Sequence, residues 1–142
     1  MKYPIPKLTF SHRKDGIDYY RLVEDYCVTI ADHEICVKEG SVTDGASIPW
    51  FVWSFGNVPL DSRILPAAVI HDDFCEKAKK AKVWEMRNIG DAYFRYILRD
   101  IGEITYFRAV VMYWLVWLQG LFTLRFTRVR KWLARQTQKR VP

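Results

Sequence analysis

The feature that most constrains the fold is a change of hydrophobic periodicity at Pro66. Before it, Tyr26, Val28 and Ile30 alternate with smaller or polar residues, which is the period of two typical of a half-buried β-strand. After it, apolar residues recur at helical spacing from Ala67 to Ala78. We therefore expect an α+β protein, in which an N-terminal antiparallel β-sheet or hairpin is packed by two or three C-terminal helices.

The strand region contains two turn signals. Segments 17–20 and 22–30 are rich in β-branched and aromatic residues, and the polar stretch 31–34 interrupts them before a short strand resumes. This pattern predicts a hairpin that pairs residues 19–30 with residues 35–42. Asp15-Gly16 is the second turn signal. Residues 41–49 have the composition of a loop.

Three helices are expected after this loop. The first begins near Pro66, because a proline lacks the N–H that would have no partner in the first helical turn. The second spans about residues 84–101, and the third begins near Ile104. The third contains an uncharged run, residues 109–124, which is shorter than the roughly 20 apolar residues that a membrane-spanning helix needs. A core helix is favoured, with an interfacial or partner-facing helix and a membrane span as the alternatives.

The net charge of +6 is unevenly distributed along the chain. The first 124 residues have a net charge of −1, and residues 125–142 hold only basic charges. The bases of this segment are Arg125, Arg128, Arg130, Lys131, Arg135, Lys139 and Arg140. We predict a single α+β domain over residues 1–124 and a basic helical tail over residues 125–142. An anionic membrane surface suits such a tail, and nucleic acid is less favoured because only Trp132 is interspersed as a stacking platform.

The three cysteines contain no C-x-x-C pair, so a structural zinc site is not predicted. Cys27 and Cys36 could pair across the expected hairpin, but reduced cysteines buried as small apolar side chains are the favoured expectation. Residues 1–10 contain no long apolar run of the kind found in a secretory signal peptide. The expected location is the bacterial host cytoplasm or a virion, with membrane association as an alternative.

One histidine lies where it could support chemistry. His71 sits on the apolar stripe of the first helix, and Asp91 lies on the next helix. A short connection makes the two helices antiparallel neighbours, so both residues fall at comparable heights. A carboxylate that accepts the Nδ1–H of an imidazole fixes its tautomer and makes it a better general base. His71 and Asp91 are therefore the candidate catalytic pair.

A divalent metal is the candidate cofactor. Asp72 follows His71, and Asp44 lies in the loop of residues 41–49. Oxygen ligands of this kind suit Ca²⁺ better than Zn²⁺, which prefers histidine and cysteine. Asp72 and Asp44 are thus the candidate metal ligands, and the surrounding loop contributes Thr43, Gly45 and Ser47 to the same site.

These residues also have plain structural explanations. A lone histidine on an apolar stripe is more often a satisfied core residue, and a His71–Asp91 hydrogen bond could serve only to fix the register of the helices. Asp44 could form a turn with its own backbone, and Ser47 could cap a short helix. Cys75, one turn after His71, is a weak candidate nucleophile because Asp72 lies near it in the sequence.

Three motifs in this order resemble those of a known family. They are T-D-G-A-S-I-P at residues 43–49, A-A-V-I-H-D at residues 67–72 and D-A-Y-F at residues 91–94. The chain resembles, over about residues 36–120, small phage- and prophage-borne domains of unknown function. The resemblance implies a phage context and no established activity.

A weaker resemblance, at the level of the site, is to the phospholipase A fold. There a helical H-D-x-x-Y motif supplies the base and a calcium ligand, and an aspartate on the next helix orients the histidine. The resemblance implies His71 as base, Asp72 as calcium ligand and Asp91 as the orienting group. Cys75 stands at the tyrosine position, and the glycine-rich calcium loop and supporting disulfides are missing, so the similarity concerns site geometry alone.

Two classes of function follow from these patterns. The first is a phage-associated, metal-dependent hydrolase that uses the His71–Asp91 pair on an ester-like or cell-envelope substrate. The second is a non-enzymatic virion-assembly or host-interaction protein, whose partner is another phage or host protein. Binding of a membrane surface or nucleic acid by the tail is a further alternative.

Overall fold

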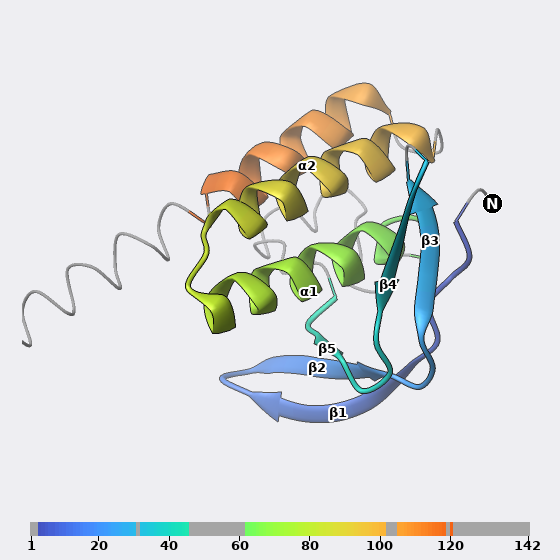
Figure 1. Ribbon diagram of the computed structural model, residues 1–142, viewed down its shortest axis with the longest axis vertical. Helices are drawn as coiled ribbons and strands as arrows, with labels where there is room; N and C mark the ends of the chain where they lie inside the picture. Colours follow the sequence, from blue (N-terminus) through green and yellow to red (C-terminus); the bar gives the residue numbers. More distant parts are fainter. Residues whose placement is uncertain (1–2, 31, 46–61, 102–104, 119, 121–142) are drawn as a thin grey trace, which may run out of the picture.

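The computed structural model describes residues 3–30, 32–45, 62–101, 105–118 and 120. Two small antiparallel sheets come first along the chain, and helices follow (Figure 1). The predicted α+β class, with strands before helices, is confirmed. The predicted boundary at residue 124 and the basic tail of residues 125–142 lie outside the described residues.

The first sheet contains β1 (Leu8–Lys14), β2 (Ile17–Leu22) and β5 (Val42–Thr43), in the order β1-β2-β5. The predicted turn at Asp15-Gly16 joins β1 to β2. Both residues have positive φ, at 51° and 80°, as a two-residue hairpin turn with the right twist requires. On the other edge of β2, Tyr20 lies opposite Thr43. This pairing holds the start of the predicted site loop.

The second sheet is a hairpin of β3 (Tyr26–Ile30) and β4 (His33–Val37). The predicted single hairpin of residues 19–30 with 35–42 is therefore wrong, because its two ends belong to different sheets. The ladder breaks at residues 23–25. There the Asp25 carboxylate accepts hydrogen bonds from the Lys38 ammonium and the Glu39 N–H. The chain turns at this point, and β3 begins a new sheet.

Cys27 and Cys36 are opposite each other in the β3–β4 hairpin and form a disulfide, with their Cα atoms 4.1 Å apart. The expectation of reduced, buried cysteines is wrong for this pair. The alternation that buries Tyr26 and Val28 turns Cys27 to the exposed face. Cys75 is a free cysteine.

The helices are α1 (Leu65–Ala81), α2 (Glu85–Asp100) and a third helix at residues 106–118. Pro66 lies in the first turn of α1. Lys82, in the left-handed conformation with φ 57°, ends α1, and its N–H donates to the carbonyl of Ala78. Only residues 82–84 separate α1 from α2, so the two form an antiparallel helical hairpin, as predicted.

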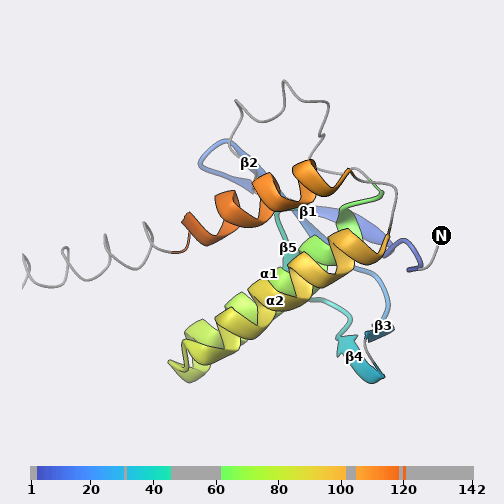
Figure 2. The same cartoon turned by 90° about the horizontal axis from the view of Figure 1, so that it is seen from above.

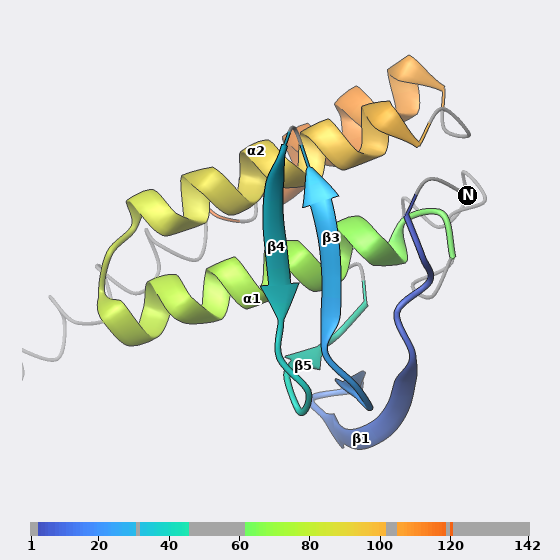
Figure 3. The ribbon, with the colours of Figure 1, turned by 45° about the vertical axis from the view of Figure 1, so that its right-hand side comes forward.

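The helical hairpin lies in the middle of the molecule. The β3–β4 hairpin crosses α1 and α2 on one side (Figure 3), and the third helix lies on the other side (Figure 2). One core joins these layers. Its members include Val28 and Ile30 from the strands, Ile70 from α1, Leu98 from α2 and Met112 from the third helix.

In the described part of the chain, no helix is both long and apolar enough to cross a bilayer. The third helix instead packs one face against the core, where Ala109 and Met112 are buried. The end of the uncharged run, residues 121–124, lies outside the described residues.

Candidate functional site

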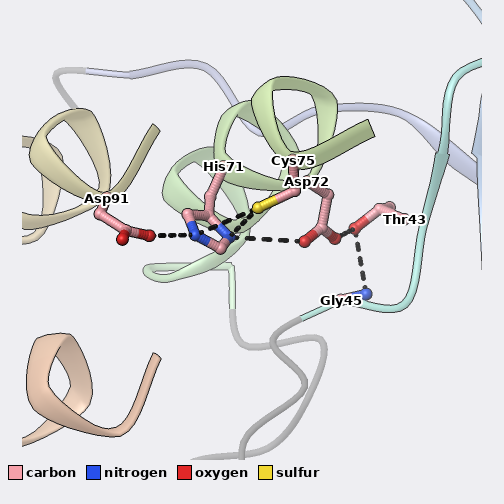
Figure 4. Close-up of polar contacts among 6 residues, drawn as sticks. All are labelled: Thr43, Gly45, His71, Asp72, Cys75 and Asp91. Carbon is pink, nitrogen blue, oxygen red and sulfur yellow. Dashed lines mark hydrogen bonds and ion pairs between the residues drawn. The ribbon is translucent and has the colours of Figure 1, made fainter. Parts of the chain in front are cut away.

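The centre of the site is a contact between α1 and α2. The His71 imidazole donates from Nε2 to the Asp91 Oδ1 at 2.7 Å (Figure 4). Both residues are buried, and His71 is only 8% exposed. The two residues thus meet across the helical hairpin, at the equivalent heights that its antiparallel geometry imposes.

Gly90 allows this close approach. A Cβ atom at position 90 would lie 2.8 Å from the Cβ of Phe74, which is inside the contact limit for carbon atoms. The missing side chain therefore lets α2 approach α1 at the residue directly before Asp91. A glycine inside a helix costs stability relative to alanine, and here it permits contact between the two functional side chains.

A row of further polar contacts extends from the opposite side of His71. Its Nδ1 lies 3.6 Å from Asp72 Oδ1, and the other oxygen of Asp72 accepts a 2.5 Å hydrogen bond from the Thr43 hydroxyl. The Thr43 hydroxyl in turn accepts the N–H of Gly45 at 3.1 Å. The β5 loop, α1 and α2 are therefore linked by one row of polar groups, which Figure 4 shows from Asp91 to Gly45.

The surroundings of the imidazole differ between its two sides. On the Asp91 side, the ring of Phe94 packs against the imidazole at a centroid distance of 5.5 Å. The sulfur of Cys75, one turn further along α1, lies near both ring nitrogens, 3.5 Å from Nε2 and 3.8 Å from Nδ1. The Asp72 side chain is 25% exposed, against 8% for that of Asp91. Asp72 is therefore the more solvent-exposed of the two carboxylates that flank the imidazole.

The protonation of His71 reflects two opposing effects. Burial lowers the pKa of the imidazole, because a charged ring loses its hydration. The contacts with Asp72 and Asp91, and with Cys75, outweigh burial and raise the pKa of His71 well above its ordinary value of 6.5. The surroundings therefore favour the charged imidazolium form of His71, which lies between two carboxylates.

The predicted metal ligands lie near Tyr19. Burial raises the pKa of the Tyr19 phenol, and the negative charges of Asp44 and Asp72 add to this effect. Asp72 is engaged by Thr43 and faces His71. Within the described ranges, no group of three His, Cys, Asp or Glu residues is placed to hold a metal ion. Ser47, the last residue of the predicted site loop, lies outside those ranges.

Sequence reasoning missed two features of the site. It paired Asp91 with Nδ1, whereas the structure pairs Asp91 with Nε2 and turns Nδ1 toward Asp72. It also included Thr43 only as a loop residue, whereas its hydroxyl connects the loop to α1. A signal for this second contact was present, because Val42 and Thr43 are two consecutive β-branched residues inside the expected loop and favour a short strand.

Residues 20–116 match the model of a family described as Protein of unknown function (DUF1353). The chain belongs to this family. It is also 38% identical over 84 residues to "Uncharacterized protein y4jT" of Sinorhizobium fredii (strain NBRC 101917 / NGR234). That match covers 59% of this chain and 23% of the relative, so the chain spans less than a quarter of its length. No solved structure matches the chain.

The family match covers every residue of the polar row that the structure describes, from Thr43 to Asp91. It establishes a shared domain of unknown function, and it assigns no reaction or partner.

Proposed function

We propose that this protein is a small hydrolase in which His71 and Asp91 form an acid–base pair that acts on an ester-like bond, such as those of the cell envelope. The observation that carries the proposal is the 2.7 Å contact between Nε2 and Asp91. It fixes the orientation of the imidazole and directs the second ring nitrogen toward the more exposed side of the site. A positioned histidine is the side chain that enzymes use most often as a general acid or base.

The chemistry follows from the position of Nδ1. The 3.6 Å between Nδ1 and Asp72 Oδ1 is too long for a direct hydrogen bond, so the lone pair of neutral Nδ1 can accept a proton from an attacking water. Neutral His71 takes a proton from this water as its oxygen attacks the ester carbonyl. The resulting imidazolium, stabilised by Asp91, then donates that proton to the leaving alcohol.

The raised pKa of His71 sets the pH dependence of this reaction. A protonated imidazole cannot act as a base, and the raised pKa of His71 shifts the neutral form to higher pH than in an ordinary histidine. The hydrolysis rate should therefore increase with pH and level off above the pKa of His71.

The test is a series of chromogenic p-nitrophenyl esters of increasing acyl length, assayed from pH 6 to pH 10. The wild-type protein should hydrolyse at least one ester above the buffer rate. His71→Gln and Asp91→Asn should lower kcat by roughly 10²-fold or more, which is the contribution typical of a positioned acid–base group. Glu76→Gln, a half-exposed position on the same helix, is the matched control and should keep the wild-type rate. Equal rates in all four proteins would refute the proposal.

A second candidate function is a non-enzymatic role as a phage virion-assembly or host-interaction protein. The observation that favours it is the burial of the polar row, since His71 is almost enclosed and every described member has a polar neighbour. In that case the polar row would have only a structural role, which is to hold the β5 loop against the helical hairpin. His71→Gln would then lower the free energy of unfolding, while the wild-type protein would hydrolyse none of the esters.

A further inference from the structure

The third helix has two apolar faces. One packs against the core through Ala109 and Met112. The other is exposed, and Phe107 and Trp114 are 76% and 52% exposed. Large aromatic side chains in water do not contribute to the core, and a contiguous group of them indicates an interaction surface.

Two arginines of α2 border the exposed face. The guanidinium of Arg95 lies 5.2 Å from the ring centroid of Tyr113, and that of Arg99 lies 5.7 Å from the ring of Tyr106. Because the helices run antiparallel, these two cation–aromatic pairs form consecutive rungs along their seam. The aromatic contacts continue from Tyr113 to Trp114, whose ring centroids are 6.1 Å apart.

The seam contains a pocket of about 620 Å³. Its lining residues are Ala92, Arg95, Tyr96, Arg99, Asp100 and Tyr113. Asp100 is the single acid among them, and its carboxylate accepts a 2.5 Å hydrogen bond from the Tyr3 hydroxyl. The two guanidinium groups therefore give the pocket a net positive charge. Arginine matches the geometry of a phosphate group, which it can bind with two parallel hydrogen bonds.

We propose that this surface docks on an anionic lipid bilayer. The surface is named here the arginine–aromatic face, and its members are Arg95, Arg99, Tyr106, Phe107, Tyr113, Trp114, Trp117 and Leu118. Its arginines bind lipid phosphates, and its tryptophans lie at the depth of the headgroups, where an amphipathic ring is favoured. The only charged side chain in the third helix is Arg108, so this helix carries no acid to repel an anionic membrane.

Charge and side-chain type favour this occupant over two others. A second copy of the chain would bring arginines against arginines, which like charges oppose. A single-stranded nucleic acid would stack its bases on the aromatic rings and use the arginines, but the aliphatic Leu118 offers it no stacking surface. The exposed aliphatic and aromatic side chains together suit acyl chains and headgroups. This inference is independent of the proposed hydrolysis, because the face lies outside the polar row.

The test is flotation of the full chain with vesicles of phosphatidylcholine alone or with 30% phosphatidylglycerol. Binding should occur only with the anionic vesicles and should weaken as the salt concentration rises. Arg95→Gln combined with Arg99→Gln should weaken it roughly 10- to 30-fold. Lys14→Gln combined with Lys79→Gln removes the same charge elsewhere and should leave binding within about twofold of wild type.

The depth at which Trp114 and Trp117 lie in the bilayer is tested by tryptophan fluorescence with lipids brominated in the acyl chain. Quenching in the wild-type protein should fall by about half or more in Trp114→Ala combined with Trp117→Ala, as these rings supply most of the exposed indole in the described helices. Circular dichroism establishes that each variant is folded.

A further full-length variant replaces the seven bases of residues 125–142 with glutamine and separates the tail from the arginine–aromatic face. Binding that persists in this variant and is lost in the arginine variant supports the proposal. The reverse pattern overturns it, as does equal binding to both vesicle types. Complete displacement from the vesicles by a single-stranded oligonucleotide would overturn it as well, in favour of a nucleic-acid partner.

Discussion

At His71 the polar contacts favour the charged imidazolium, whereas burial disfavours it. His71 lies on the buried stripe of α1 beside Phe94, where burial favours a neutral ring. Asp91 and Asp72 reverse this preference. Helical spacing and a short connection were sufficient to predict that His71 and Asp91 would meet. The choice of ring nitrogen depends on side-chain rotamers and on the position of Asp72, which a sequence pattern does not encode.

The raised pKa of His71 predicts how stability changes with pH. A group whose pKa is higher in the folded than in the unfolded state stabilises the fold fully below its unfolded value, here near 6.5. That stabilisation is lost as pH rises through the folded pKa. The difference in free energy of unfolding between wild type and His71→Gln should therefore shrink from pH 6 upward. Urea unfolding at a series of pH values measures it, and a difference that grows with pH would contradict the assignment.

Pairings between helices or strands that are close in the sequence were easier to predict than pairings between distant segments. The α1–α2 hairpin was predictable, because its periodicity and its connection are both local features. The pairing of β2 with β5 was not, since the entire β3–β4 hairpin lies between them in the chain. The short strand β5 has little pattern of its own, and its position depends on the neighbouring strand and on the link from Thr43 to α1.

The close approach of α1 and α2 predicts the effect of Gly90→Ala. Alanine is the better helix former by about 1 kcal/mol, so an isolated helix would gain stability. Here its Cβ would meet that of Phe74 at 2.8 Å, and neither carbon can rotate away. The helices must separate, and we expect a net loss of about 1–3 kcal/mol in the free energy of unfolding. Ala92→Gly, at an exposed position on the same helix, is the reverse substitution and should cost only about 1 kcal/mol through helix propensity.

Gly90→Ala also tests whether the close approach of α1 and α2 raises the pKa of His71. Moving α2 outward lengthens the contact between His71 and Asp91, so the pKa of His71, followed by NMR, should fall toward its ordinary value. A stability gain with an unchanged pKa would show that the helices have room for the methyl group.

In the molecule as a whole, the net positive charge comes from a different part of the chain than the described hydrophobic core. The net charge of +6 comes from residues 125–142, and the near-neutral remainder contains the polar row. The core, in contrast, is shared by the β3–β4 hairpin, both helices of the hairpin and the third helix. Composition predicted one domain with a buried core. It did not predict that two separate small sheets would pack against one helical hairpin, because sheet membership is decided by contacts between distant segments.

This shared core predicts how the molecule unfolds when the Cys27–Cys36 disulfide is removed. Cross-linking residues at a sequence separation of 9 restricts the unfolded chain, and a closed loop of that size stabilises the fold by about 2–3 kcal/mol. Cys27→Ser combined with Cys36→Ser should therefore lower the Tm by roughly 5–12 °C. Because Val28 and Ile30 pack in the same core as Ile70 and Leu98, the variant should still unfold in one calorimetric transition. Cys75→Ser is the control for the free thiol. Two transitions in the variant would mean that the β3–β4 hairpin unfolds independently of the helices, and that the disulfide rather than the core joins them.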